Sequence, residues 1–309
     1  MDEGSLKNSE ILFIYEVKLA NPNGDPDDEN RPRIDPKTKT NLVTDVRLKR
    51  FFRDYVIDKF GEDHIWVSKQ DGQNVDATER FKHFDNDPDK VLKMAIDARL
   101  FGATIPKKKG EKESKGESYS FIGPLQFAWG HSLHKVDMVD TRSITSLFSG
   151  REVGEGNIGK DYRVYYSLIA FYGAFNKNRA STVKCTQNDI KIFDNFVWEA
   201  VKSESITRSK IGHYPHLYLR VELEDNESYI GDLRRFIKVK QKTEGVRKLD
   251  DLELDFSDLL NVINGHNVYV NCSEEFKQLF CEKLDSKGTN YLPHKEVNLS
   301  ALEQTGVKA

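Results

Sequence analysis

The sequence predicts an α+β fold, in which a ferredoxin-like or RRM-type core carries a large helical insertion and a β-hairpin. Residues 11–19 have the pattern of an apolar strand and are followed by an amphipathic helix at about residues 45–58. The same order recurs late in the chain, where a strand, a helix and a strand are predicted at residues 162–175, 189–202 and 217–223. A strand, a helix, an insertion, more strands, a helix and a strand form the order of such a core.

The opening strand and helix carry clear signals. Residues 11–19 (ILFIYEVKL) are rich in β-branched and aromatic side chains and alternate in polarity up to Leu19, as in a strand buried on at least one face. Thr44 is a good helix N-cap, and Asp45 complements the helix dipole in the first turn. The apolar stripe that follows has helical spacing and should pack on the strand: Leu48, Phe51, Phe52, Tyr55 and Val56.

Four positively charged side chains of this helix lie outside the apolar stripe. They are Arg47, Lys49, Arg50 and Arg53, and we expect all four to point outward. Such clusters are also common on solvated helix faces that bind nothing.

The turn between strand and helix favours a binding role for these cations. Two prolines fix φ between Asn21 and Pro26, and Gly24 permits a positive φ, so the strand should end in a rigid bend. Asn21 and Asn23 add side-chain amides to the backbone donors of the turn. Point charges beside such donors suit a phosphate group.

Several runs of sequence carry a family resemblance. The first three are NPNGDPD from Asn21, RPRIDP from Arg31 and VTDVRLKR from Val43. Three more follow as AIDARLFGA from Ala95, GPLQF from Gly123 and YRV through YG between Tyr162 and Gly173. As a set and in this order, they resemble the backbone subunit of type I CRISPR Cascade complexes, nearest the I-B-like branch. This subunit is the seventh CRISPR-associated protein of the RAMP superfamily.

The resemblance implies a non-catalytic subunit without a cofactor or a metal. Such a subunit binds crRNA, polymerises along it as copies of itself, contacts other Cascade subunits and presents the guide for pairing with target DNA. The turn residues Asn21, Asn23 and Gly24 and the four helix cations would hold the RNA. Arg208 and Lys210 would add contacts from a loop that we expect at the sheet end opposite the turn.

A glycine-rich segment within residues 137–165 predicts a hairpin tip. It resembles the projecting thumb that backbone subunits lay over the guide RNA and onto the next subunit. Arg142, Ser143 and Ser146 would lie near its base. At its tip, Val153 or Ile158 could wedge between bases or pack on the neighbouring protein.

The same segment contains a misleading nucleotide-binding pattern. Gly154, Gly156 and Gly159 spell GxGxxG, and Gly154 to Lys160 also fits the start of a P-loop. Asp161 stands where a P-loop needs a magnesium-binding hydroxyl, and a strand pattern follows instead of a helix. No nucleotide site is predicted here.

The expected domain organisation is a palm with an insertion. Residues 1–60 and 119–309 should form the RRM-like palm with a C-terminal flank, and the thumb should be inserted in it at about residues 137–165. Residues 61–118 should form a finger-like insertion, with a helix that begins after Asp87 and ends before Gly102. Its lysine-rich stretch at 106–118 should be mobile because it has almost no apolar residue.

Residues 119–131 predict one strand around the turn-like Gly123-Pro124.

The composition limits the classes of function that this protein can have. The chain has 309 residues, 31% charged and 38% hydrophobic residues, and a net charge of −3, so a polyanion site must be local. No apolar run approaches the length of a membrane span and no signal peptide is evident, so a cytoplasmic protein is expected. The three cysteines have no CxxC spacing and predict neither a disulfide framework nor a zinc knuckle.

Two other functions stay open. Asp25, Asp27, Asp28, Glu29 and Asp35 could hold Mg²⁺ in a target-RNA endonuclease of the type III kind, although prolines after Asp25 and Asp35 indicate turn chemistry. A general single-stranded RNA-binding protein would instead need exposed aromatic side chains. His213 and His216 lack ligand partners at metal spacing, so no metal site is predicted.

Overall fold

The computed structural model describes residues 6–70, 73–107, 118–140, 143–146, 157–204, 210–224, 228–284 and 288–292. Some predicted features lie outside these residues, namely most of the lysine-rich loop (108–117), Arg142, Val153 and Arg208.

The fold is mixed α+β and is organised around one eight-stranded sheet. Strand β1 (Ser9–Ala20) lies at its centre, antiparallel to β11 (Val164–Phe175) on one side and to β12 (His213–Glu222) on the other. The full order is β16 (Thr289–Tyr291), β15 (Asn267–Cys272), β12, β1, β11, β8 (Gly130–Ser132) and β4 (Leu42–Val43), and β7 (Leu125–Phe127) also pairs with β11. Within this sheet only the β15–β16 pair is parallel among the described strands.

Strand β1 is buried on both faces because the sheet lies between two hydrophobic cores. Phe13 and Tyr15 belong to the core under one face, whereas Leu12 and Ile14 belong to the core over the other. The predicted strand is confirmed, but its alternation ends early. Leu19 adopts a positive φ of 50° and is 48% exposed, and it is left out of the pairing with β11, whose register is unchanged from Lys18 to Ala20.

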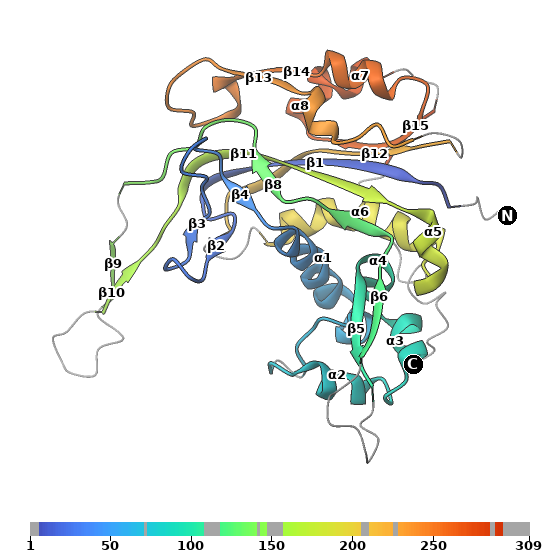
Figure 1. Ribbon diagram of the computed structural model, residues 1–309. Coiled ribbons are helices and arrows are strands. Elements are labelled where there is room, and N and C mark those ends of the chain that lie inside the picture. Colours follow the sequence, from blue (N-terminus) through green and yellow to red (C-terminus); the bar gives the residue numbers. More distant parts are fainter. Residues whose placement is uncertain are drawn as a thin grey trace.

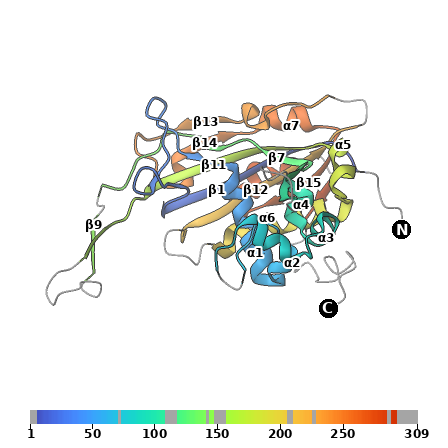
Figure 2. The same cartoon turned by 60° about the horizontal axis from the view of Figure 1, so that its bottom comes forward.

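Helices α1 (Asp45–Phe60) and α6 (Gln187–Glu204) lie side by side against the first face (Figures 1 and 2). The Thr44 hydroxyl accepts a hydrogen bond from the Arg47 amide at 3.3 Å, which confirms the predicted N-cap. The predicted stripe is buried at Leu48, Phe51, Phe52 and Val56, and Tyr55 packs against the same core.

The segment between α1 and the next sheet strand forms short elements below α1 in Figure 1. They are η1 (Glu62–His64), α2 (Ala77–His83), α3 (Pro88–Met94), α4 (Ile96–Phe101), β5 (Gly102–Pro106) and β6 (Ser118–Ile122). The prediction of a single helix after Asp87 is wrong in one respect. Two helices form, because Ala95 takes an extended conformation and separates α3 from α4. Arg99 of α4 forms a buried ion pair with Asp189 of α6 at 2.8 Å, which fastens the segment to the core.

The single strand predicted at residues 119–131 is three strands, β6, β7 and β8. Strand β6 pairs with β5 in a separate hairpin, whereas β7 and β8 join the main sheet. Gly123 and Gly102 meet where the hairpin leaves the sheet, and a Cβ on Gly123 would lie 2.3 Å from the Gly102 nitrogen. The backbones can approach this closely only without side chains.

The C-terminal segment covers the second face of the sheet, above β1 and β12 in Figure 1. Its elements are η3 (Leu233–Phe236), β13 (Lys238–Gln241), η4 (Leu249–Asp251), β14 (Leu252–Asp255), α7 (Ser257–Ile263), α8 (Glu274–Leu279) and η5 (Cys281–Lys283). Phe256 and Phe276 share a core with Leu12 and Ile14 of β1. Cys272 and Cys281 form a disulfide, which the cysteine spacing did not predict.

Three smaller features complete the described chain. Strands β2 (Gly24–Asp25) and β3 (Arg31–Pro32) form a hairpin after β1, and α5 (Lys177–Ala180) and η2 (Ser181–Val183) connect β11 to α6. Strands β9 (Ser143–Ser146) and β10 (Asn157–Lys160) pair in a hairpin that projects from the sheet in both views (Figures 1 and 2). None of the described helices is both long and apolar enough to cross a membrane.

Candidate nucleic-acid interface

The side chains of the turn at residues 21–24 tie it to the chain on both sides. The Asn23 side-chain oxygen accepts hydrogen bonds from the Thr44 amide at 2.9 Å and from the Thr44 hydroxyl at 3.0 Å. The Asn21 amide donates to the Asn30 carbonyl at 2.7 Å. The turn is therefore tied to the start of α1 and to the β2–β3 hairpin.

Gly24 is needed at this turn for a reason other than the predicted one. It is absent from the residues with positive φ, so the predicted use of its conformational freedom is wrong. A Cβ at this position would lie 2.7 Å from the Asn30 carbonyl oxygen. The hairpin backbone crosses too close to the turn for any other residue.

Lys210 supports the same turn from the loop before β12. Its ammonium group is buried and donates to the carbonyls of Asn21 and Pro22. The predicted placement of this loop at the opposite sheet end is therefore wrong. The loop lies at the turn because β1 and β12 are antiparallel neighbours, so β12 begins where β1 ends. Lys210 positions the turn, whereas Arg208 lies outside the described residues.

Two of the four helix cations differ from the predicted outward arrangement. Arg53 is buried and pairs with Asp97 at 2.7 Å. Lys49 has a side chain only 11% exposed and pairs with Asp45 at 3.0 Å. The helix pattern missed both because α4 and β7 cover this side of α1, so Lys49 also reaches Gln126 of β7 at 3.1 Å.

The other two cations remain accessible beside the turn. The half-buried Arg47 lies with its guanidinium 4.2 Å from the centre of the Phe51 ring. Arg50, one turn further along, has a side chain 35% exposed and pairs with Asp54 through its Nε at 2.9 Å. These are the helix cations that a phosphate group can approach.

Some charged residues near the turn were missed by sequence reasoning. Lys18 is exposed at the end of β1, and its amide donates to the Gly212 carbonyl at 2.9 Å, but its side chain lines a pocket with Lys242 and Glu275 of the C-terminal layer, on the face of the sheet away from α1. Arg163 donates to the Leu19 carbonyl at 2.8 Å from the start of β11. Their signal in the sequence was weak, because each is a single charge beside an apolar strand pattern.

The β2–β3 hairpin is also fastened to the base of the thumb. The Glu29 carboxylate accepts hydrogen bonds from the Lys160 ammonium and the Tyr162 hydroxyl, both at 2.6 Å, and these bonds lower the pKa of Glu29 to about 2. The Arg31 guanidinium lies 4.7 Å from the centre of the Tyr162 ring. Of the predicted thumb residues, Ser143 and Ser146 lie on β9 and Ile158 lies on β10, where only their backbone is described. The predicted place of Ile158 at the tip of the hairpin is wrong, because this residue pairs with Thr145 within the two strands.

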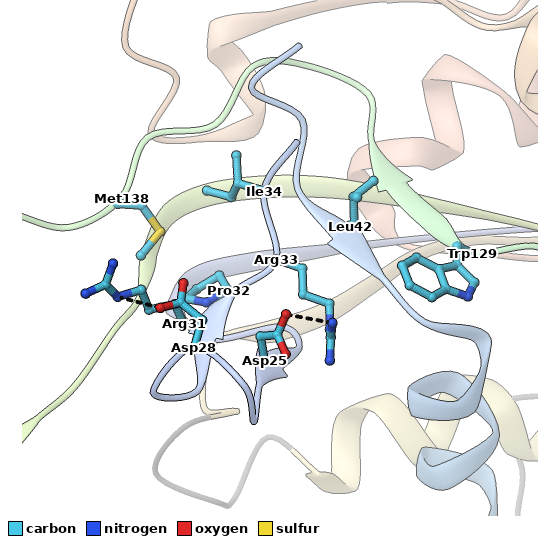
Figure 3. Close-up of a pocket in the computed structure, with 9 residues that line it drawn as sticks. All are labelled: Asp25, Asp28, Arg31, Pro32, Arg33, Ile34, Leu42, Trp129 and Met138. Atoms are coloured by element: carbon cyan, nitrogen blue, oxygen red, sulfur yellow. Dashed lines mark hydrogen bonds and ion pairs between the residues drawn. The ribbon is translucent and has the colours of Figure 1, made fainter. Parts of the chain in front are cut away.

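A pocket of about 440 Å³ lies between this hairpin and the strands beside it (Figure 3). Arg33 enters it from β3, and its ion pair with Asp25 measures 2.8 Å. Trp129, which precedes β8, is 49% exposed and faces the other side of the pocket. An exposed indole beside guanidinium groups is a surface on which a nucleobase can stack.

Three of the five carboxylates considered for metal chemistry, Asp25, Glu29 and Asp35, are engaged otherwise. Asp25 pairs with Arg33, and Asp35 accepts the Lys37 amide at 2.8 Å, which lowers the pKa of Asp35. Within the described residues, no group of three or more His, Cys, Asp or Glu side chains is arranged to hold a metal ion.

His213 lies beneath the turn, stacked 5.7 Å from the ring centre of Tyr15. Burial, with the nearby Lys210 charge as a second cause, lowers the pKa of His213 to about 3. His216, three residues later, lies on the other face of the sheet against Phe276 at a ring-centre distance of 4.9 Å.

Comparison with known proteins decides the family. The family model described as CRISPR-associated protein Cas7 matches residues 7–257. The chain belongs to the Cas7 family. A curated CRISPR-associated protein Cas7 from Haloferax volcanii is 31% identical over 288 residues, which cover 84% of this chain and 83% of the relative.

Two solved structures are also similar to this Cas7-family chain. One is titled CRISPR RNA-guided surveillance complex, with a TM-score of 0.49, 14% identity, and coverage of 96% of this chain and 97% of that chain. The other has the same title with the word pre-nicking, a TM-score of 0.49, 11% identity, and coverage of 96% and 98%. Likeness at this level supports no conclusion on function.

Replacing Arg53 should destabilise the fold, whereas replacing Arg50 should not. Arg53→Ala leaves the buried Asp97 carboxylate without its cation, and we expect the free energy of unfolding to fall by about 3 kcal/mol. Arg50→Ala removes a half-exposed pair on the same helix and should cost no more than about 1 kcal/mol. Urea unfolding of both variants measures the difference. Equal losses would mean that Arg53 is exposed in solution.

Acid should destabilise the protein partly through His213. Because its pKa is lower in the folded state than in the unfolded chain, the unfolded state binds more protons between about pH 3 and 6.5. Stability from this group is complete above that window and declines as the pH falls. The wild type should lose up to about 1.4 kcal/mol per pH unit more than His213→Gln. Urea unfolding at pH 4 to 7 measures both slopes, and parallel slopes would contradict the burial of a neutral His213.

Proposed function

We propose that this Cas7-family chain is the non-catalytic, crRNA-binding backbone subunit of a type I CRISPR Cascade complex. Copies of it line up along one guide RNA, contact the other Cascade subunits and present the guide bases for pairing with target DNA. The observation that carries this proposal is the rigid turn at residues 21–24, which is fixed to α1 beside the accessible cations Arg47 and Arg50.

The turn and its neighbours suit the sugar-phosphate backbone of RNA. A rigid bend presents its amides in fixed directions, and Arg47 and Arg50 add charges that attract phosphate. Such contacts position a strand without reading its bases. The proposed RNA contacts are Asn21, Asn23, Gly24, Arg47 and Arg50, with Arg142, Ser143, Ser146 and Arg208 as further contacts taken from the family resemblance.

The finer architecture belongs to the same proposal. The strand order β12, β1, β11, β8, with α1 and α6 on one face, supports a ferredoxin-like or RRM-type palm. Residues 61–118 would be the finger, and the β9–β10 hairpin would be the thumb that reaches the next copy. Val153 would act at its tip. The contacts of Glu29 with Lys160 and Tyr162 support a thumb whose base is held in place against the palm.

Removing the two accessible helix cations should weaken RNA binding without regard to sequence. We expect the double variant Arg47→Ala/Arg50→Ala to lose affinity for several unrelated guide-length RNAs by a similar factor. The slope of log K against log salt should become shallower by about 0.7 for each phosphate group that the variant no longer neutralises. Fluorescence anisotropy at several salt concentrations measures both quantities.

The matched control for this experiment is Lys90→Ala/Lys184→Ala. It removes two cations whose ion pairs with Asp85 and Asp89 both measure 2.6 Å and which take no part in the proposed interface. Its affinity and salt slope should equal those of the wild type. The proposed mechanism would be wrong if the control lost as much affinity as the test variant, or if the test variant lost affinity for one RNA sequence alone.

A further inference from the structure

A second pocket, of about 270 Å³, opens beside α1 in the segment that follows it. Arg50 borders it from α1, and Arg80 borders it from α2. The extended stretch between η1 and α2 supplies Ser68 and Lys69. Arg50 thus belongs both to this pocket and to the accessible edge of α1 beside the turn.

Arg80 is a buried cation without a counter-charge at hydrogen-bond distance. Its side chain donates from Nη2 to the carbonyls of Glu62 at 2.5 Å and Ile65 at 2.7 Å. Nε and Nη1 are buried and have no acceptor among the described residues. Burial also lowers the pKa of Arg80. A buried guanidinium with two unused donors is costly unless an anion completes it.

The rest of the pocket is arranged for an anion. The Ser68 hydroxyl is likewise buried without a hydrogen-bond partner in the described structure, and Lys69 is exposed at the rim. The acid that lines the pocket, Asp76, is engaged as the N-cap of α2, where it accepts the amides of Thr78 at 2.8 Å and Glu79 at 2.9 Å. Glu62, Asp63 and Asp97 raise the pKa of Arg80 by their charges, and none of them forms an ion pair with it in the described structure.

We propose that the pocket lined by Arg50, Ser68, Lys69 and Arg80 is a phosphate-binding site. Arg80 supplies the buried charge and free donors, Ser68 supplies a hydroxyl, and Lys69 and the Asp54-paired Arg50 supply charges at the entrance. Because Arg50 connects the pocket to the proposed RNA path, the phosphate would come from the bound strand. This source rests on the proposed function, whereas the affinity for a phosphate group does not.

The decisive variant is Ser68→Asp, which places a carboxylate in the pocket and gives Arg80 a partner of its own. The first measurement is isothermal titration with inorganic phosphate at constant ionic strength. The wild type should bind phosphate, and Ser68→Asp should weaken this binding by about tenfold or more. The melting temperature of Ser68→Asp should be equal or higher, because the buried guanidinium gains a counter-charge. The control Lys90→Ala should bind phosphate as the wild type does.

A second arm identifies the source of the phosphate. If Ser68→Asp also weakens binding of a guide-length RNA, the strand supplies the phosphate group. If it weakens inorganic phosphate alone, the site holds free phosphate. The proposal is overturned if the wild type does not bind inorganic phosphate, or if the folded Ser68→Asp variant binds phosphate and RNA as tightly as the wild type. Loss of RNA binding in Arg47→Ala, which leaves every residue of this pocket in place, tests the proposed function separately.

Discussion

The bend that ends β1 is the constraint on which the candidate interface depends. Asn23 binds the residue that caps α1, Lys210 binds the carbonyls of the bend, and Asn21 binds the hairpin that follows. Each contact comes from a different part of the chain. The end of the central strand, the start of α1 and the beginning of β12 therefore meet at one point, and the bend cannot shift without disturbing all three.

These hydrogen bonds explain why the polar segment that follows the central strand β1 can be rigid. A loop that is held by hydrogen bonds from its carbonyls and side chains to the rest of the protein gives up its conformational entropy on folding, before any ligand arrives. The cations that remain accessible, Arg47 and Arg50, project from the helix that the bend helps to begin. Binding a strand there would require little further ordering of the backbone.

The sequence predicted the elements of the core well. The strand at β1, the Thr44 cap and the buried faces of α1 and α6 follow from local periodicity, which one sequence contains. It could not predict which cations of α1 are exposed. Arg53 and Lys49 lie off the apolar stripe, but α4 and β7 cover them, and that contact depends on segments 40 or more residues away.

The other differences between the predictions and the structure also come from contacts between distant segments of the chain. Lys210 reaches the bend because of strand pairing that no local pattern encodes, and Gly24 is required by the crossing of the hairpin rather than by its own φ. Residues after 230 carried no motif, yet they build a second core on the far face of β1 through Phe256 and Phe276. The burial of β1 on both faces depends on tertiary packing. The apolar run in the sequence of β1 is consistent with such burial but does not predict it.

The most direct test of the account is photo-crosslinking of a guide-length RNA to the protein, followed by identification of the crosslinked peptides. The account predicts crosslinks within residues 18–25 and 44–51, at the bend and the first turns of α1. Crosslinks confined to the C-terminal layer, at residues 238–263, would place the RNA on the opposite face of the sheet and would contradict it.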